Sequence, residues 1–126
     1  MKSLLTWNNK TGHEIRSRIL QSAEQDLREL RAYLIKQFGN ESWQNSYANI
    51  KAAISKLKTF PHIGSTPDAL EQLNLSQYRQ IISGQNRIIY EVRQKTLYVH
   101  VVVDTRRDMK SLLTRRLLRV VELDSR

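Results

Sequence analysis

The sequence contains no cysteine, only two prolines and four glycines, and no long apolar run. The lack of cysteine excludes disulfides, thiolate catalysis and thiolate zinc sites, which fits a reducing cytoplasm. No stretch approaches the roughly 18 apolar residues of a membrane span. The opening residues also lack the apolar run of a signal peptide. We therefore expect a cytoplasmic protein that does not enter a membrane.

The chain is long enough for one domain and carries a strong positive charge. It has 126 residues, of which 40% are apolar and 26% are charged, a composition typical of a globular domain. Its net charge of +9 attracts polyanions. Nucleic acid, an acidic membrane face and an acidic protein segment all fit such a surplus, and the charge alone does not choose among them.

A strand and two amphipathic helices are predicted in the first half. Residues 14–22 alternate in polarity, which indicates a strand. Ser22, with Gln25 three residues later, is typical of a helix N-cap, and apolar residues then follow at helical spacing until Gly39 ends the helix. Asn40 can begin a second helix of the same kind. The two helices should form an antiparallel hairpin.

The second half predicts three strands and a last helix. Residues 78–83 and 86–92 flank the turn sequence "SGQN", residues 96–103 form the next strand, and a short helical turn is expected near 68–75. Asp108 can cap a final helix with an apolar stripe. The order β-α-α-β-β-β-α predicts an α+β domain, an antiparallel sheet with the helical hairpin on one face.

The first strand can join this sheet as a fourth strand, and the sheet's other face is expected to be open to solvent or a partner. Burial on one face would explain why Leu97, Val99, Val101 and Val103 alternate with Tyr98 and His100.

Several arginines lie within the predicted strands or directly after them. In the expected hairpin register Ile82 lies opposite Arg87, and Arg79 lies on the other face. Arg106 and Arg107 follow the last strand and would extend a cationic edge together with Arg87. Guanidinium groups at such a site suit phosphate or carboxylate. Alternatively, the arginines pair with Glu91, Asp104 and Asp108 and only solvate the sheet.

No motif for a hydrolase, a nucleotide-binding protein or a metal site is present. The three histidines, His13, His62 and His100, do not fall at ligand spacing. His100 is either a general base or a half-buried strand residue with one hydrogen bond. We expect neither metal nor cofactor. The basic, amphipathic C-terminal helix would close over the core or dock on a partner, and it lacks an aromatic anchor for a membrane surface.

Several segments together resemble the RelE/ParE superfamily of toxins from bacterial toxin-antitoxin modules. They are "SAEQDLRELRAYL", "ISKLKTFPHIG", "YRQI", "NRIIYEV" and "VVVDTRRD" running into "LLTRRLL". The resemblance covers residues 14 to about 118. It implies a toxin domain over residues 14–126, with residues 1–13 as an N-terminal extension.

The resemblance implies one of two activities. RelE-like members cleave ribosome-bound messenger RNA without a metal, and Arg87 and Arg107 match their two arginines, with His100 as the candidate base. Tyr78 and Gln80 stand where the family's lysines are expected, and Leu113 stands where its tyrosine is expected. These departures favour a ParE-like protein that inhibits DNA gyrase without catalysis. Tyr90 and Tyr98 are alternative proton carriers, so the RelE-like reading stays open.

The resemblance also implies a partner, a cognate antitoxin that lays an extended, acidic C-terminal segment on the toxin. A basic surface suits such a segment. The residues expected to bind the target or the antitoxin are Arg79, Arg87, Arg106, Arg107, Arg115, Arg116 and Arg119.

Overall fold

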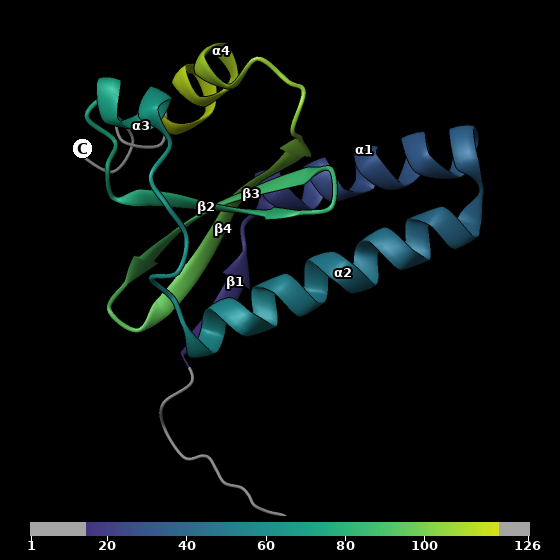
Figure 1. Cartoon of the computed structure of the whole chain (residues 1–126), viewed down its shortest axis with the longest axis horizontal. Coiled ribbons are helices and arrows are strands. Elements are labelled where there is room, and N and C mark those ends of the chain that lie inside the picture. Colours follow the sequence, from purple (N-terminus) through teal and green to yellow (C-terminus); the bar gives the residue numbers. More distant parts are fainter. Residues whose placement is uncertain (1–14, 119–126) are drawn as a thin grey trace, which may run out of the picture.

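A computed structural model describes residues 15–118 and confirms the α+β class. The elements follow the predicted order, including the short helical turn near 68–75, and the described chain ends in a π-helical turn (Figure 1). They are β1 (Arg16–Ile19), α1 (Gln21–Phe38), α2 (Asn40–Thr59), α3 (Asp68–Gln72), β2 (Tyr78–Ser83), β3 (Asn86–Arg93), β4 (Thr96–Asp104), α4 (Met109–Leu113) and η1 (Thr114–Leu118).

The four strands form one mixed sheet in the order β1-β4-β3-β2. Strands β2, β3 and β4 make the predicted antiparallel meander, and Ile82 pairs with Arg87 as expected. Strand β1 joins the sheet as its fourth strand but runs parallel to β4. Both helices and the β2–β3 hairpin separate these two strands in the chain, so no tight turn forces them to be antiparallel.

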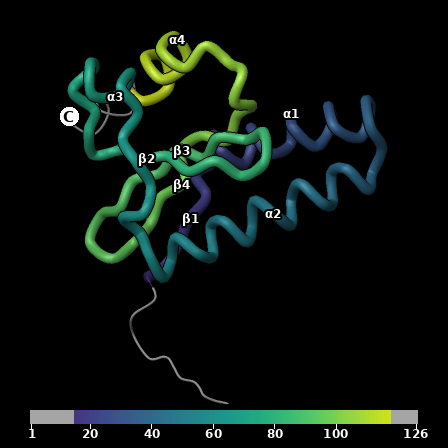
Figure 2. Tube along the Cα trace, in the orientation of Figure 1, coloured from purple at the N-terminus to yellow at the C-terminus, as the bar shows by residue number. Residues whose placement is uncertain are grey.

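The helical hairpin is as predicted, although its N-terminal cap is not. Gly39 ends α1 with φ 98°, and its amide donates hydrogen bonds to the carbonyls of Leu34 and Ile35, both at 3.1 Å. The helix begins before Ser22, whose hydroxyl instead contacts the carbonyl of His100 at 3.4 Å. Helices α1 and α2 lie side by side and extend well beyond the sheet (Figure 2).

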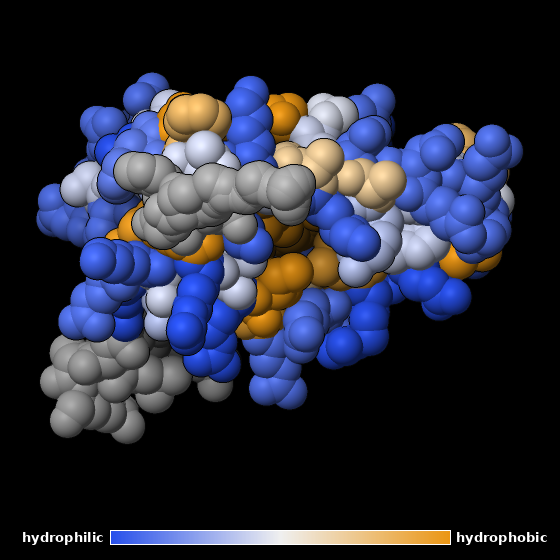
Figure 3. Space-filling view, turned by 90° about the horizontal axis from the view of Figure 1, so that it is seen from below, coloured by the Kyte–Doolittle hydropathy of each residue, from blue (hydrophilic) through white to orange (hydrophobic). Residues whose placement is uncertain are grey.

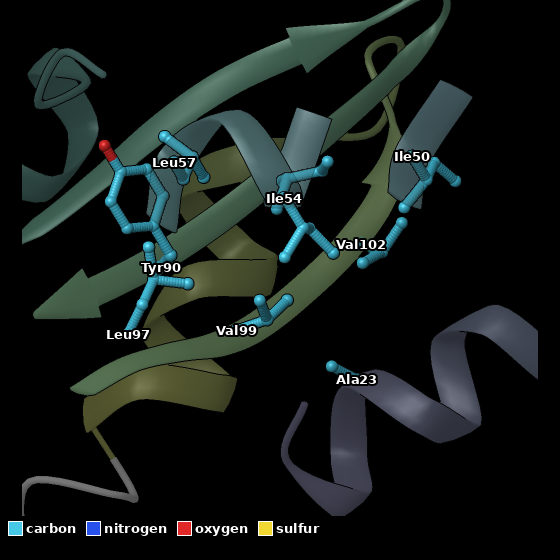
Figure 4. Packing of buried hydrophobic residues seen from close by; sticks show 9 residues of the cluster. Ala23, Ile50, Ile54, Leu57, Tyr90, Leu97, Val99 and Val102 are labelled. Carbon is cyan, nitrogen blue, oxygen red and sulfur yellow. The ribbon is translucent and has the colours of Figure 1, made fainter. Parts of the chain in front are cut away.

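The first core cluster lies between the helical hairpin and the sheet. Aliphatic side chains of α2 meet Tyr90 and the valines of β4, and Ala23 brings α1 close to the sheet (Figure 4). Its buried members are Ala23, Ile50, Ile54, Leu57, Ile88, Tyr90, Leu97, Val99 and Val102.

The second face of the sheet is covered over its central strands, so the prediction of an open face is wrong there. A second cluster packs Leu112, Leu113 and Leu117 from the C-terminal helical segment against this face. Strands β2, β3 and β4 supply Tyr78, Ile89, Val101 and Val103, and Leu70 and Leu75 complete the layer. The C-terminal segment therefore closes over the core, which is the first of its two predicted roles.

A β-bulge in β4 explains how one strand feeds both clusters. Ile89 pairs with Val101 whereas Tyr90 pairs with Val99, so His100 is an extra residue in β4. Leu97 and Val99 face the helical hairpin, and Val101 and Val103 face α4. The prediction that these four residues share one face is wrong because the bulge reverses the alternation.

Within residues 15–118, no helix has the length and apolar character needed to cross a membrane. The view from below shows a surface that is largely hydrophilic, with apolar residues visible toward its middle (Figure 3).

Candidate functional site

A large groove lies where the helical hairpin projects past the sheet. Its volume is about 930 Å³, and it lies between α1, α2, the β2–β3 turn and the end of β4. Apolar side chains of α1 line it, and Phe38 is 67% exposed and Tyr33 48% exposed. Exposed aromatic rings beside a groove mark a surface suited to a protein segment.

Two predicted arginines stand at this groove. Arg106 forms a bidentate ion pair with Asp104, with nitrogen to oxygen distances of 2.9 and 3.0 Å. The hydrogen bond from Arg106 holds the pKa of Asp104 below its ordinary value. Arg107 is exposed, and its side chain makes no hydrogen bond or ion pair with any residue in 15–118. Arg107 therefore remains available to a partner.

Arg87 lies on the sheet face that carries α4 and does not line the groove. Its guanidinium donates hydrogen bonds to the Gln80 side chain and to the carbonyl of Thr105, the latter at 3.4 Å. Its Nε is buried and has no hydrogen-bond partner among the described residues. The groove lining includes Arg106 and Arg107 but not Arg87, so the predicted cationic edge is divided between two surfaces.

Arg79 lies on the opposite face from Arg87, as predicted, and holds a loop. It donates to the carbonyl of Gly64 at 2.7 Å and to that of His62 at 3.3 Å. These contacts attach the loop that follows α2 to the sheet. Arg79 thus has a structural role in addition to any binding role.

Arg116 links the C-terminal segment to α1 and to the edge of β4, beyond the part of that strand that pairs with β1. We call these contacts, made by Arg116 and Asp26, the clasp. Arg116 forms two 3.0 Å hydrogen bonds to the carboxylate of Asp26 in α1 and one of 2.9 Å to the carbonyl of His100. Asp26 also accepts the amide of Val102 at 3.0 Å. Asp26 has no recognisable motif in the sequence, and only the fold brings it to this edge.

Arg115 and Arg119 are the other two arginines predicted to bind from the C-terminal segment. Arg115 is exposed. Arg119 lies outside the described residues.

The candidate proton-transfer groups are buried. His100 Nε2 lies 2.8 Å from Glu91 Oε1, and each residue is 4% exposed. The Tyr78 ring packs edge-on against His100 at 5.0 Å, and Leu113 is fully buried. Burial raises the pKa of Glu91, but the hydrogen bond and charge of His100, aided by Arg93, outweigh it and leave the pKa below its ordinary value. Glu91 is therefore a paired carboxylate.

The tyrosines that the sequence left as alternatives are placed differently. Tyr90 is fully buried, donates to the carbonyl of Pro61 at 2.8 Å and accepts the Gly64 amide at 3.1 Å. Burial raises its pKa, so the phenol gives up its proton less readily. Tyr98 is half-buried on β4. Within residues 15–118, no three acidic or histidine side chains converge on a point where they could hold a metal.

Comparison with known proteins agrees with this architecture. The family model described as "ParE toxin of type II toxin-antitoxin system, parDE" matches residues 18–109. Among curated proteins none matches the chain. A solved structure of the chromosomal ParDE toxin-antitoxin system from P. aeruginosa is similar, with a TM-score of 0.61 at 12% identity over 74% of this chain and 98% of that one. The toxin-antitoxin complex RelBE2 from Mycobacterium tuberculosis has a TM-score of 0.52 at 17% identity over 72% and 98%.

Proposed function

The chain belongs to the family of ParE toxins of type II toxin-antitoxin systems, and we propose that it inhibits DNA gyrase, without catalysis, until a cognate antitoxin neutralises it. Both partners would meet it in the cytoplasm, where unopposed toxin would arrest growth. The observation that supports this most is the burial of His100 in its pair with Glu91. A metal-free ribonuclease needs a group that can reach the substrate and accept a proton.

Neighbouring positions support the same conclusion. Arg107 is exposed, but Tyr78 and Glu91, two residues on the sheet face behind α4 that could exchange protons with a substrate, are at most 4% exposed, and Tyr98 on the same face is half-buried. The side chain at Leu113 cannot carry a proton. An exposed cation without an accompanying base suits binding better than bond cleavage.

The groove supports the antitoxin as a partner. Phe38, Tyr33 and Leu34 offer apolar contacts, and Arg107 at the same groove offers positive charge, since Arg106 is already paired with Asp104. An amphipathic segment with acidic residues would satisfy both features. We propose that the antitoxin's acidic C-terminal segment lies here.

A supercoiling assay tests the gyrase proposal. Purified chain should block supercoiling of relaxed plasmid by gyrase, and an equimolar amount of its antitoxin should restore it. Arg107→Ala should weaken the inhibition, whereas Lys36→Ala, which removes an exposed cation from α1, should leave it unchanged. Gyrase that supercoils normally in excess chain would contradict the proposal.

The alternative function is a ribosome-dependent endoribonuclease that uses Arg87 and Arg107, with His100 as its base. The half-buried Arg87, with one buried nitrogen that has no hydrogen-bond partner among the described residues, favours it. Incubation with programmed ribosomes followed by primer extension tests it. Cleavage of the message that is lost in Arg107→Ala would establish this function and remove the first.

A further inference from the structure

The sheet has a second cationic surface, at the end opposite to the groove. The register places side chains in two rows across β1, β4 and β3, because directly paired residues share a face. Arg16 pairs with Thr96, which pairs with Arg93, and Arg18 pairs with Tyr98, which pairs with Glu91. Arg16 and Arg18 are two residues apart on one strand, so they are separated by about 6.6 Å along it.

Among residues 15–118, the two rows contain a single carboxylate. Arg16 and Arg18 are exposed, and the Arg93 side chain is 51% exposed. The one carboxylate in the two rows, Glu91, is 4% exposed and is engaged by His100 and Arg93. Lys58, at the end of α2, lines the same hollow as Arg16 and Arg18. The result is a positively charged patch on the sheet.

The lining of this hollow separates it from the groove. Its residues are Arg16, Ser17, Arg18, Lys58, Thr96 and Tyr98, none of which is aliphatic. A docked protein segment generally needs apolar anchors, and the groove beside α1 supplies Leu30, Leu34 and Phe38 whereas this hollow does not. The two surfaces therefore suit partners of different chemistry.

We propose that this cationic patch binds the phosphate backbone of duplex DNA. Guanidinium groups match phosphate with two parallel donors, and Tyr98, in the row of Arg18, adds a neutral hydroxyl donor. The choice of duplex DNA over other polyanions rests on the proposed inhibition of gyrase, an enzyme that holds duplex DNA. The patch would then contact DNA while other surfaces of the toxin contact protein.

The salt dependence of binding to a fluorescein-labelled 20-base-pair duplex tests the proposal. The slope of log Kd against log salt falls by about 0.9 for each phosphate contact removed. The double variant R16Q/R18Q should therefore lose about two units of slope and bind at least tenfold more weakly. The matched control, R31Q/K36Q, removes the same charge from exposed positions of α1 and should bind within about twofold of the unaltered chain.

A second measurement needs no variant. DNA should protect Arg16 and Arg18 from phenylglyoxal modification and leave Arg31 reactive. Equal losses in the two double variants would overturn the proposal, because net charge alone would then explain the binding. Tighter binding to a single-stranded RNA of the same sequence would overturn it as well. The proposal would also be overturned if the R16Q/R18Q chain kept its affinity for DNA but lost its affinity for an acidic antitoxin peptide.

Failure of the gyrase proposal would look different. The chain would then leave supercoiling by gyrase unaffected while the R16Q/R18Q variant still lost affinity for the free duplex.

Discussion

At the scale of single residues, the fold gives two arginines of similar sequence context opposite roles. Arg115 is exposed, whereas Arg116 is half-buried and bound by the Asp26 carboxylate and the His100 carbonyl. The sequence predicts both as binding residues, because a basic amphipathic segment does not reveal which cation turns inward. Arg116 joins the C-terminal segment to α1 and β4, so its first role is in stability.

We predict that Arg116→Ala lowers the free energy of unfolding by about 2 kcal/mol. The change leaves Asp26, whose side chain is 10% exposed, without its charge partner, and breaking such a pair is more costly than losing a surface pair. Urea denaturation measures the loss. Arg115→Ala is the matched control and should change the unfolding free energy by less than about 0.5 kcal/mol. Equal effects in the two variants would show that the clasp has no energetic importance.

The Glu91 and His100 pair predicts an acid limit to stability. Because the pKa of Glu91 is lowered in the folded state, its contribution is full above its ordinary pKa of about 4.5 and is lost as the pH falls through the lower folded value. Thermal melts between pH 6 and pH 3 should show this decline. In Glu91→Gln the decline should be shallower, whereas Glu71→Gln, at an exposed position of α3, should keep the profile of the unaltered chain.

At the scale of elements, the loop after α2 is held to the sheet by a tight contact at Gly64. A Cβ at this position would lie 2.5 Å from the Tyr90 hydroxyl and 2.6 Å from the backbone oxygen of Gln80. We predict that Gly64→Ala costs about 1–3 kcal/mol of stability, because the backbone oxygen cannot move without disturbing β2. Chemical denaturation tests this. Ser65→Ala, at the exposed neighbour, should be nearly neutral, and a neutral Gly64→Ala would contradict the contact.

Most elements could be predicted from the sequence because their signals are local. Gly39 ends α1, and the Gly84 and Gln85 turn sets the β2–β3 register, which places Ile82 opposite Arg87 as predicted. The bulge at His100 was missed, because nothing in a run of branched residues shows where one is unpaired. The parallel pairing of β1 also depends on tertiary packing and has no local signal.

At the scale of the whole molecule, the helical hairpin, the sheet and the C-terminal segment form three layers with a groove at one end. We predict that Phe38→Ser weakens binding of the antitoxin at least tenfold, since exposed aromatic residues at the centre of a docking groove often dominate affinity. Isothermal titration calorimetry measures the change. Phe60→Ser is the control, because Phe60 is 54% exposed but does not line the groove.

Thermal melts should confirm that both serine variants remain folded. If the Phe38 variant and the unaltered chain bound the antitoxin with equal affinity, the antitoxin segment would have to bind outside the groove.

The candidate site could be predicted only in part. The sequence indicates which arginines belong to the sheet, and the faces of Arg79 and Arg87 follow from the hairpin register. It does not indicate that α4 covers part of the face that carries Arg87, or that Phe38 and Tyr33 line the same groove as Arg107. These juxtapositions depend on how far the helical hairpin extends past the sheet.

The additional residue in β4 also decides where that strand can change its length. Deleting His100 would remove the bulge and leave Val101, Val102 and Val103 facing the layers they face now, because Ile89 and Tyr90 would keep Val101 and Val99 as partners. The branched side chains of β4 can be exchanged for one another at modest cost. A residue gained or lost elsewhere in β4 would turn the rest of the strand to the opposite layer, so β4 tolerates a change in composition more readily than a change in count.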